Sequence, residues 1–98
     1  MSFPIIFRRA ARAEFDDAAH WYEQRQAGLG ATFADAVQKV LDRIAVQPDF
    51  YPQVFQGARE ALVSGFPYCV YYREEAGGVF VLSIFHTARN PTIWQSRA

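Results

Sequence analysis

The stretch VFVLSIFH, residues 79–86, is apolar at almost every position. A strand with one face in water alternates apolar with polar side chains, whereas a strand buried on both faces does not. Residues 79–86 are therefore predicted to form a central strand, covered by helices on at least one side. The segment ARNPTIW, residues 88–94, follows His86 with an arginine and a tryptophan. Turn residues alone would suffice for an exit into solvent, so this segment indicates either a site or a packed C-terminal lid.

Three more segments have the composition of strands. Residues 66–74, FPYCVYYRE, are rich in aromatic and β-branched side chains, and residues 59–65, REALVSG, alternate apolar with polar side chains less cleanly. The link EAGG at 75–78 is a hairpin signal, so these two segments and the central strand are predicted to form a meander. A further strand is expected at 3–7, FPIIF.

Two helices are predicted between the first strand and the meander. From Arg9 to Gln26 apolar residues recur at helical spacing, and the glycines within 25–32 end that pattern. Thr32 is expected to cap a second helix, which Pro48 ends. Because the link is short, the helices are predicted to form an antiparallel hairpin. Their apolar stripes contain Ala11, Phe15, Ala18 and Tyr22 in the first helix, and Phe33, Val37, Val40, Leu41 and Ile44 in the second.

The order of elements is strand, helix, helix and three strands, followed by a short C-terminal tail. Residues 47–57, before the meander, contain two prolines and a glycine and are predicted to be a loop. The sequence therefore predicts an α+β fold of β-α-α-β-β-β order, with a helical hairpin packed on a largely antiparallel sheet. Ninety-eight residues suit one small domain, so residues 1–98 are expected to form a single domain.

The charges of the chain balance. Ten Lys and Arg stand against ten Asp and Glu, and Lys39 is the only lysine. No strong overall field is therefore available to hold a polyanion by releasing its counterions. Any contact with nucleic acid or phosphate would have to come from a few well-placed arginines.

Cysteine and histidine are too sparse for a disulfide framework or a metal site. The single cysteine, Cys69, lies in the middle of a predicted strand, where a free cysteine is usually a small buried hydrophobe. His20 and His86 are 66 positions apart and show no ligand spacing. No apolar run approaches about 20 residues and no leader pattern is found, so a cytoplasmic protein without a membrane partner, metal or cofactor is expected.

Arg8, Arg9 and Arg12 lie at the start of the first predicted helix. Positive charge there opposes the helix dipole, so these side chains form either a solvated face or a patch that contacts an anion or a partner. Arg12 is also expected to pair with Asp16, four positions on. Arg9 and Arg12 are therefore candidates for partner binding.

The two tryptophans are the other candidates for partner binding. Trp21 and Tyr22 are adjacent, and neighbouring side chains on a helix point about 100° apart. Tyr22 belongs to the apolar stripe, which places Trp21 at the rim, either as a simple packing residue or as an anchor for a partner. Trp94 lies in the C-terminal segment.

Arg59, Arg73, His86 and Arg89 are the candidate catalytic residues. Arginines around an imidazole suit a phosphate, and RNA cleavage through the 2′-OH needs the acid, base and charge stabilisation that these types supply. In a meander, however, Arg73 lies at the opposite edge from His86. Arg59 reaches the level of His86 only if the register allows it, so the predicted topology does not by itself gather the four side chains.

Six motifs occur in a characteristic order along the chain. They are Ala13-Glu14-Phe15-Asp16-Asp17, WYE at 21–23, GLG at 28–30, the spaced set F…A…I…P…YP that follows it, FPYCVYYR at 66–73 and HTARNPTIW at 86–94. Taken with the order of strands and helices, this set resembles the RelE/ParE superfamily of type II toxins, and its ParE-type or plasmid stabilisation branch in particular. The elements FPY…YR and H-x-x-R-x-P-x-x-W carry most of the resemblance, which extends from about Phe7 to Trp94.

The resemblance implies a small toxin encoded beside an antitoxin, whose C-terminal segment wraps around the toxin and neutralises it. Members similar to RelE cut mRNA in the ribosomal A site, whereas members similar to ParE block DNA gyrase and have no established catalytic residues. The expected partners are thus a cognate antitoxin and a replication protein such as DNA gyrase, or alternatively the ribosome and mRNA.

Three features separate this chain from the RNA-cleaving branch, which is typically strongly basic. The net charge is zero, residues 50–58 contain no lysine, and the tail WQSRA has neither tyrosine nor histidine. Since a ribosomal nuclease must bind a dense polyanion, a protein-targeting toxin is favoured over the endonuclease. A member that still binds its antitoxin but is no longer toxic is a third hypothesis.

Overall fold

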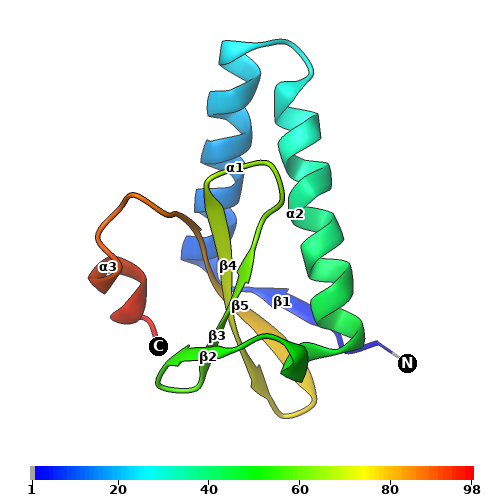
Figure 1. Cartoon of the computed structure of the whole chain (residues 1–98), viewed down its shortest axis with the longest axis vertical. Coiled ribbons are helices and arrows are strands. Elements are labelled where there is room, and N and C mark those ends of the chain that lie inside the picture. Colours follow the sequence, from blue (N-terminus) through cyan, green and yellow to red (C-terminus); the bar gives the residue numbers. More distant parts are fainter. Residues whose placement is uncertain (1) are drawn as a thin grey trace.

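A helical hairpin lies against one face of a five-stranded sheet in the computed structural model, which describes residues 2–98 (Figure 1). The helices are α1 (Arg9–Arg25), α2 (Leu29–Val46) and the short α3 (Thr92–Gln95), and a 3-10 turn, η1, spans Pro48–Phe50. The strands are β1 (Ile5–Phe7), β2 (Gln53–Phe55), β3 (Ala58–Leu62), β4 (Tyr68–Glu75) and β5 (Gly78–His86). The predicted α+β class and helical hairpin are confirmed.

The strand order across the sheet is β1-β5-β4-β3-β2. Strands β2 to β5 pair antiparallel, and β1 pairs parallel to β5 with Ile5 opposite Val79. The largely antiparallel sheet and the interior position of 79–86 are therefore confirmed. The predicted loop at 47–57 is wrong in one part, because β2 forms within it and pairs with the start of β3.

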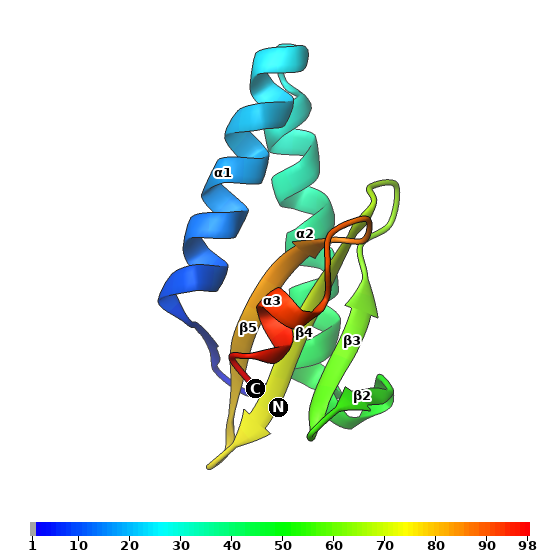
Figure 2. The same ribbon diagram turned by 90° about the vertical axis from the view of Figure 1, so that its left-hand side faces the viewer.

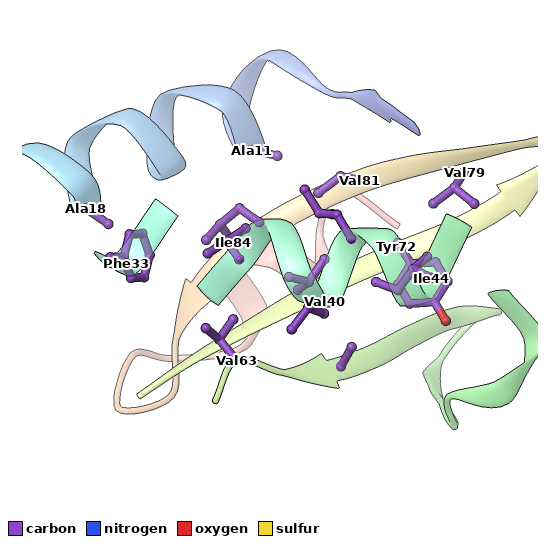
Figure 3. Packing of buried hydrophobic residues seen from close by; sticks show 14 residues of the cluster. Ala11, Ala18, Phe33, Val40, Ile44, Val63, Tyr72, Val79, Val81 and Ile84 are labelled. Atoms are coloured by element: carbon purple, nitrogen blue, oxygen red, sulfur yellow. The ribbon is translucent and has the colours of Figure 1, made fainter. Parts of the chain in front are cut away.

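The main core lies between the sheet and the helical hairpin (Figure 3). Phe33 of α2 is fully buried and its ring lies 5.1 Å from the ring of Tyr22 on α1. From the sheet, Tyr72 sends its hydroxyl to the carbonyl of Pro48, which satisfies the phenol within the core. The predicted stripes of both helices supply the buried side chains Ala11, Ala18, Phe33, Val37, Val40, Leu41 and Ile44.

The second helix begins three residues before its predicted cap at Thr32. Gly28, with φ of +88°, precedes the first helical residue, and the carboxylate of Glu23 accepts hydrogen bonds from the amides of Gly28 and Gly30 at 2.9 and 3.0 Å. A carboxylate at this end of α2 satisfies free N–H groups and complements the helix dipole. Thr32 instead bonds back to the carbonyl of Gly28 from inside the helix.

The C-terminal tail covers the other face of the sheet (Figure 2). Trp94 of α3 is 2% exposed and stacks on Tyr71 of β4, with ring centroids 3.8 Å apart. Leu82 and Phe85 of β5 complete this smaller core. Strand β5 is thus buried on both faces, as its composition predicts.

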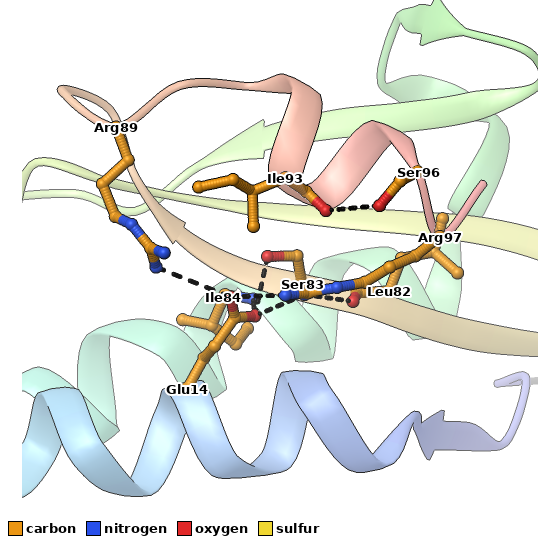
Figure 4. Close-up of polar contacts among 8 residues, drawn as sticks. All are labelled: Glu14, Leu82, Ser83, Ile84, Arg89, Ile93, Ser96 and Arg97. Carbon is orange, nitrogen blue, oxygen red and sulfur yellow. Dashed lines mark hydrogen bonds and ion pairs between the residues drawn. The ribbon is translucent and has the colours of Figure 1, made fainter.

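Glu14 of α1 ties the tail to the sheet (Figure 4). Its carboxylate accepts hydrogen bonds from the Ser83 hydroxyl at 2.8 Å and from the backbone N–H of Ile84 at 3.2 Å. Both outer nitrogens of Arg97 also donate to it, at 2.9 and 3.2 Å, and Arg97 donates further to the carbonyl of Leu82. One carboxylate therefore joins α1, β5 and the chain end.

Among residues 2–98, no helix has both the length and the apolar character that a membrane crossing needs.

Gly30 allows the two helices to approach closely, so replacing it should destabilise the hairpin. A Cβ at Gly30 would lie 2.6 Å from the carbonyl oxygen of Ala19 on α1. We expect Gly30→Ala to lower the free energy of unfolding by about 1–3 kcal/mol, although alanine favours an exposed helix by about 1 kcal/mol over glycine. Thermal unfolding measures this, and Ala31→Gly is the control, expected to lose only the propensity difference. A more stable Gly30→Ala variant would contradict the close contact.

Replacing Glu14 should loosen the tail. We expect Glu14→Gln to cost about 1.5–3 kcal/mol, because the amide keeps the size but loses the charge that binds Arg97. Denaturant unfolding measures the loss, and amide exchange at 92–97 should speed up. The control is Asp16→Asn, which breaks an exposed pair with Arg12 and should change stability by less than about 0.5 kcal/mol. Equal losses in the two variants would show that Glu14 acts only as a surface charge.

Candidate functional site

A groove of about 510 Å³ runs between α1 and the ends of β4 and β5 that meet at His86. Aromatic, acidic and basic side chains share it. Its walls consist of Glu14, Asp17, Ala18, Trp21, Tyr22, Pro67, Tyr68, Ile84, His86 and Arg89. It therefore brings together two of the candidate catalytic residues, His86 and Arg89, and one of the candidate partner-binding residues, Trp21.

His86 is held by its neighbours. Its Nδ1 accepts a hydrogen bond from the backbone N–H of Ala88 at 3.0 Å, and its ring packs edge-on against Tyr68 at 5.1 Å. A neutral imidazole that accepts at Nδ1 carries its proton on Nε2. The nitrogen that remains free is then a donor, so His86 would have to break its bond to Ala88 before it could act as a general base.

Arg89 supplies the exposed positive charge of the groove. Its guanidinium lies 3.9 Å from a Glu14 oxygen and 4.9 Å from the ring centre of Phe85, and its side chain is 50% exposed. Glu14 already holds Arg97 through two nitrogens. Arg89 therefore keeps donors for an outside group, with Asp17 as the opposing charge at the rim.

The two tyrosines of the groove are neutral donors at physiological pH. Burial raises the pKa of the Tyr22 phenol above its ordinary value. Burial is also the main cause that raises the pKa of Tyr68, with a smaller contribution from the negative charge of Glu14 and an opposing one from Arg89. Neither phenol is thus prepared to act as a base.

Trp21 stands at the mouth of the groove, 51% exposed. The guanidinium of Arg25 lies 4.3 Å from its ring centre, and its ring meets Tyr22 edge-on at 5.2 Å. As expected, Trp21 lies at the rim, whereas Tyr22 is partly buried and packs against the core. A half-exposed tryptophan beside an arginine has the composition of a protein-contact anchor.

Arg9 and Arg12 are exposed on the first turns of α1, outside the groove. Arg12 pairs with Asp16 at 3.6 Å, as predicted, and its guanidinium covers the rings of Phe7 and Phe15. Part of its surface is therefore engaged within the chain, whereas Arg9 projects into solvent.

Arg59 and Arg73 lie at the opposite end of the sheet from His86. His86 faces Tyr68 at the start of β4, whereas Arg59, at the start of β3, faces Tyr72 in the second half of β4. Arg59 donates to the backbone carbonyls of Asp49 and Tyr51, and Arg73 donates to that of Gln56 at 2.9 Å. Each also faces a carboxylate, Glu74 at 3.5 Å for Arg59 and Glu75 at 3.7 Å for Arg73. Both guanidiniums therefore fasten loops beside the sheet.

Trp94 and Cys69 belong to the core beneath the tail. Trp94 is buried and its Nε1 has no hydrogen-bond partner among residues 2–98, so its ring is not presented to a partner on this surface. Cys69 is 3% exposed, and burial raises the pKa of its thiol. No group of side chains suited to a metal ion occurs in the described part of the chain.

Two residues that shape the groove are absent from the sequence-based candidates, Glu14 and Tyr68. For Glu14 the sequence holds a usable signal, because it lies three positions after Ala11 and four before Ala18 on the buried side of α1. A carboxylate so placed indicates a paired, buried charge. Tyr68 is one of many aromatic residues in β4, and the pattern alone does not single it out.

Comparison with known proteins bears on the fold and the family. A solved structure described as the chromosomal ParDE TA system from P. aeruginosa contains a chain that is similar to this one with a TM-score of 0.63. The identity is 16%, and the alignment covers 87% of this chain and 96% of that chain, so the likeness concerns the fold. No curated protein sequence matches the chain.

The family model is more informative. The family described as ParE toxin of type II toxin-antitoxin system, parDE, matches residues 5–91, which include both helices of the hairpin and the entire sheet. This match confirms the resemblance inferred from the ordered motifs. The chain belongs to the ParE toxin family of type II toxin–antitoxin systems.

Proposed function

We propose that this toxin arrests growth by binding a protein of DNA replication, such as DNA gyrase, and that a cognate antitoxin neutralises it. In this proposal the chain works as a binding protein and carries out no bond cleavage. Trp21 and the cations Arg9 and Arg12, all exposed on α1, are the proposed contacts.

The observation that carries this proposal is the separation of the candidate catalytic residues. A ribonuclease needs several cations around one phosphate and a free base beside the 2′-OH. Here Arg59 and Arg73 lie at one end of the sheet, bound to backbone carbonyls, and His86 lies at the other. The Nδ1 lone pair of His86 is also occupied by the amide of Ala88.

One observation favours the alternative, a ribosome-dependent mRNA endonuclease. His86 and Arg89 line one groove together with Tyr68 and Trp21, which offers aromatic faces and a cation to a nucleotide. His86 and Arg89 are only two groups with which to bind and cleave a phosphodiester. The zero net charge of the chain also gives no long-range attraction for RNA. The alternative is therefore the second candidate.

The cognate antitoxin is proposed from the family and from the similar fold. The family description names a two-component system, and the similar structure is described as a toxin–antitoxin assembly. A reading frame for a short DNA-binding protein next to the gene of this toxin would support the module.

Whether DNA synthesis or protein synthesis stops first distinguishes a gyrase target from a ribosomal one. We expect that, after induction without antitoxin, incorporation of labelled thymidine falls before incorporation of labelled amino acids, and that the purified chain inhibits DNA supercoiling by gyrase. His86→Gln should preserve both effects, because the replacement keeps the size and a hydrogen-bond donor but removes the acid–base group. Loss of both effects in a folded His86→Gln variant, with mRNA cleavage by the wild-type chain on ribosomes, would establish the endonuclease instead.

The proposed contact at Trp21 can be tested with a matched control. We expect Trp21→Ala to weaken inhibition of gyrase at least about tenfold, because truncation of a tryptophan anchor typically costs more than 1–2 kcal/mol of binding energy. Phe50→Ala removes another exposed aromatic ring, 70% exposed and far from the groove, and should leave inhibition unchanged. Thermal unfolding checks that both variants are folded. Equal effects of the two variants would remove Trp21 from the proposed contact.

A further inference from the structure

The groove between α1 and the ends of β4 and β5 contains hydrogen-bond donors that the chain itself does not use. In the sheet, the hydroxyls of Tyr71 and Tyr72 both bond within the chain. Those of Tyr22 and Tyr68 line the groove and have no hydrogen-bond partner within residues 2–98. Because burial raises the pKa of both groove phenols, each keeps its proton and can donate it to a ligand.

The turn after β5 holds Arg89 at this groove. The N–H of Thr87 donates to the carbonyl of Pro67 at 2.9 Å, and the N–H of Arg89 donates to the carbonyl of His86 at 3.1 Å. The side chain points toward Glu14, but its guanidinium stays 3.9 Å from the nearest carboxylate oxygen (Figure 4). That distance is too long for a hydrogen bond. The position of Arg89 is therefore fixed while its donors remain free.

Arg89 and the two phenols line the same stretch of the groove. The rings of Tyr22 and Tyr68 have their centres 6.2 Å apart. The pKa of Tyr68 is raised further by the charge of an ionised Tyr22 and lowered by that of Arg89, and both effects require proximity. The three side chains can thus donate to one acceptor group.

The charges of the groove limit what this acceptor is. Glu14 is occupied by two hydrogen bonds from Arg97, so Arg89 and Asp17 are the remaining charged side chains of the lining. One guanidinium beside neutral donors matches a single carboxylate. A nucleic-acid strand carries a charge at every phosphate, and the lining offers it Asp17 but no second arginine or lysine. The groove therefore favours an acidic side chain of a protein over a phosphodiester.

Apolar surface surrounds these donors. Ala18 and Ile84 contribute to the lining, and Trp21, 51% exposed, stands at the mouth. An apolar surrounding strengthens a hydrogen bond to a charged group, and a half-exposed tryptophan is a frequent anchor of protein contacts. The groove thus suits an acidic residue that has an apolar neighbour.

We propose that this groove takes up an acidic side chain of the target protein, whose carboxylate accepts hydrogen bonds from Arg89 and from the hydroxyls of Tyr22 and Tyr68. An apolar neighbour of that acidic residue packs on Trp21. The inference rests on the proposed function, because the partner is the replication protein that the toxin inhibits. It makes Arg89 a contact for protein and not for RNA.

Arg89→Gln and Tyr68→Phe remove donors one at a time, with purified DNA gyrase in a supercoiling assay as the probe. We expect Arg89→Gln to raise the concentration for half inhibition about 30-fold, because a charged donor is lost, and Tyr68→Phe about fivefold, because a neutral one is lost. Thermal unfolding checks that each variant is folded.

The chain offers a matched control for each change. Arg8 is 49% exposed in its side chain, lies 3.8 Å from Glu75 and covers the ring of Phe80, whereas Arg89 is 50% exposed beside Glu14 and covers Phe85. Arg8→Gln therefore removes an equivalent arginine outside the groove, and Tyr51→Phe removes a phenol outside it. Both should leave inhibition unchanged.

Arg89→Lys identifies the acceptor chemically. A carbodiimide joins an ammonium to a carboxylate that it touches, and Lys39→Arg removes the only other lysine. In this double variant, mass spectrometry of the mixture with gyrase should find position 89 joined to an aspartate or glutamate of a gyrase subunit. Arg8→Lys in the same background should give no cross-link to gyrase.

Equal inhibition by wild type and a folded Arg89→Gln variant would overturn the inference, as would cross-links of the introduced lysine to Glu14 or Asp17 of its own chain alone. Binding of an oligoribonucleotide that Arg89→Gln abolishes would also overturn it, because the groove would then take phosphate. A wild-type chain that leaves gyrase fully active would instead overturn the proposed function, whatever the variants do.

Discussion

Strand β5 is buried on both of its faces, and this constraint decides where the rest of the chain lies. Val79, Val81 and Ile84 face the helical hairpin, whereas Leu82 and Phe85 face the tail. A helical hairpin covers only one face of a sheet, so the chain after β5 must fold back over the other. The segment after His86 meets this need, with Trp94 as its main side chain. It is foremost a packed lid, and the groove with His86 and Arg89 forms where it leaves the sheet.

The edges of the sheet follow from the same arrangement. Strand β1 is three residues long and leaves half of β5 unpaired, and the carboxylate of Glu14 together with Arg97 takes the place of the missing strand. This solution keeps α1 and the tail in contact with β5 at one point. Strand β2 is equally short, and within residues 2–98 no strand pairs with the outer edge of β3 beyond Glu60. Within residues 2–98 the two edges therefore differ, because side chains complete the edge at β5 whereas the outer edge of β3 is paired along only part of its length.

The elements with a strong pattern could be predicted from the sequence. Both helices have long apolar stripes, and β4 and β5 are rich in large apolar residues, so tertiary packing and local preference agree. Strand β2 could not be predicted, because three residues between Pro52 and Gly57 carry no period and pair only once β3 is in place. The predicted cap at Thr32 places the start of α2 too late, because the free N–H groups there bond to Glu23 of the preceding helix.

The candidate site was predictable only in part, for a reason that concerns charge. Residue type and strand position predict that His86 and Arg89 lie close together. They do not predict which hydrogen-bond acceptor each arginine side chain contacts. Arg59 binds the carbonyls of Asp49 and Tyr51, which come from a turn whose course depends on how α2 ends. The sequence suggests that these arginines are free to bind phosphate, whereas in the structure they hold loops in place. For Glu14, by contrast, the spacing from Ala11 and Ala18 on α1 is enough to predict a partly buried carboxylate.

The way the charges are used also bears on what the surface can bind. Of the ten basic side chains, six form ion pairs within residues 2–98, which leaves four: Arg9, Arg25, Lys39 and Arg43. Arg9 and Arg25 stand at opposite ends of α1, and the other two lie on α2. Cations so scattered do not follow the even charge spacing of a nucleic-acid backbone, on which affinity for a polyanion depends. This distribution supports the proposed protein target, because separate cations can each face an acidic side chain of a partner.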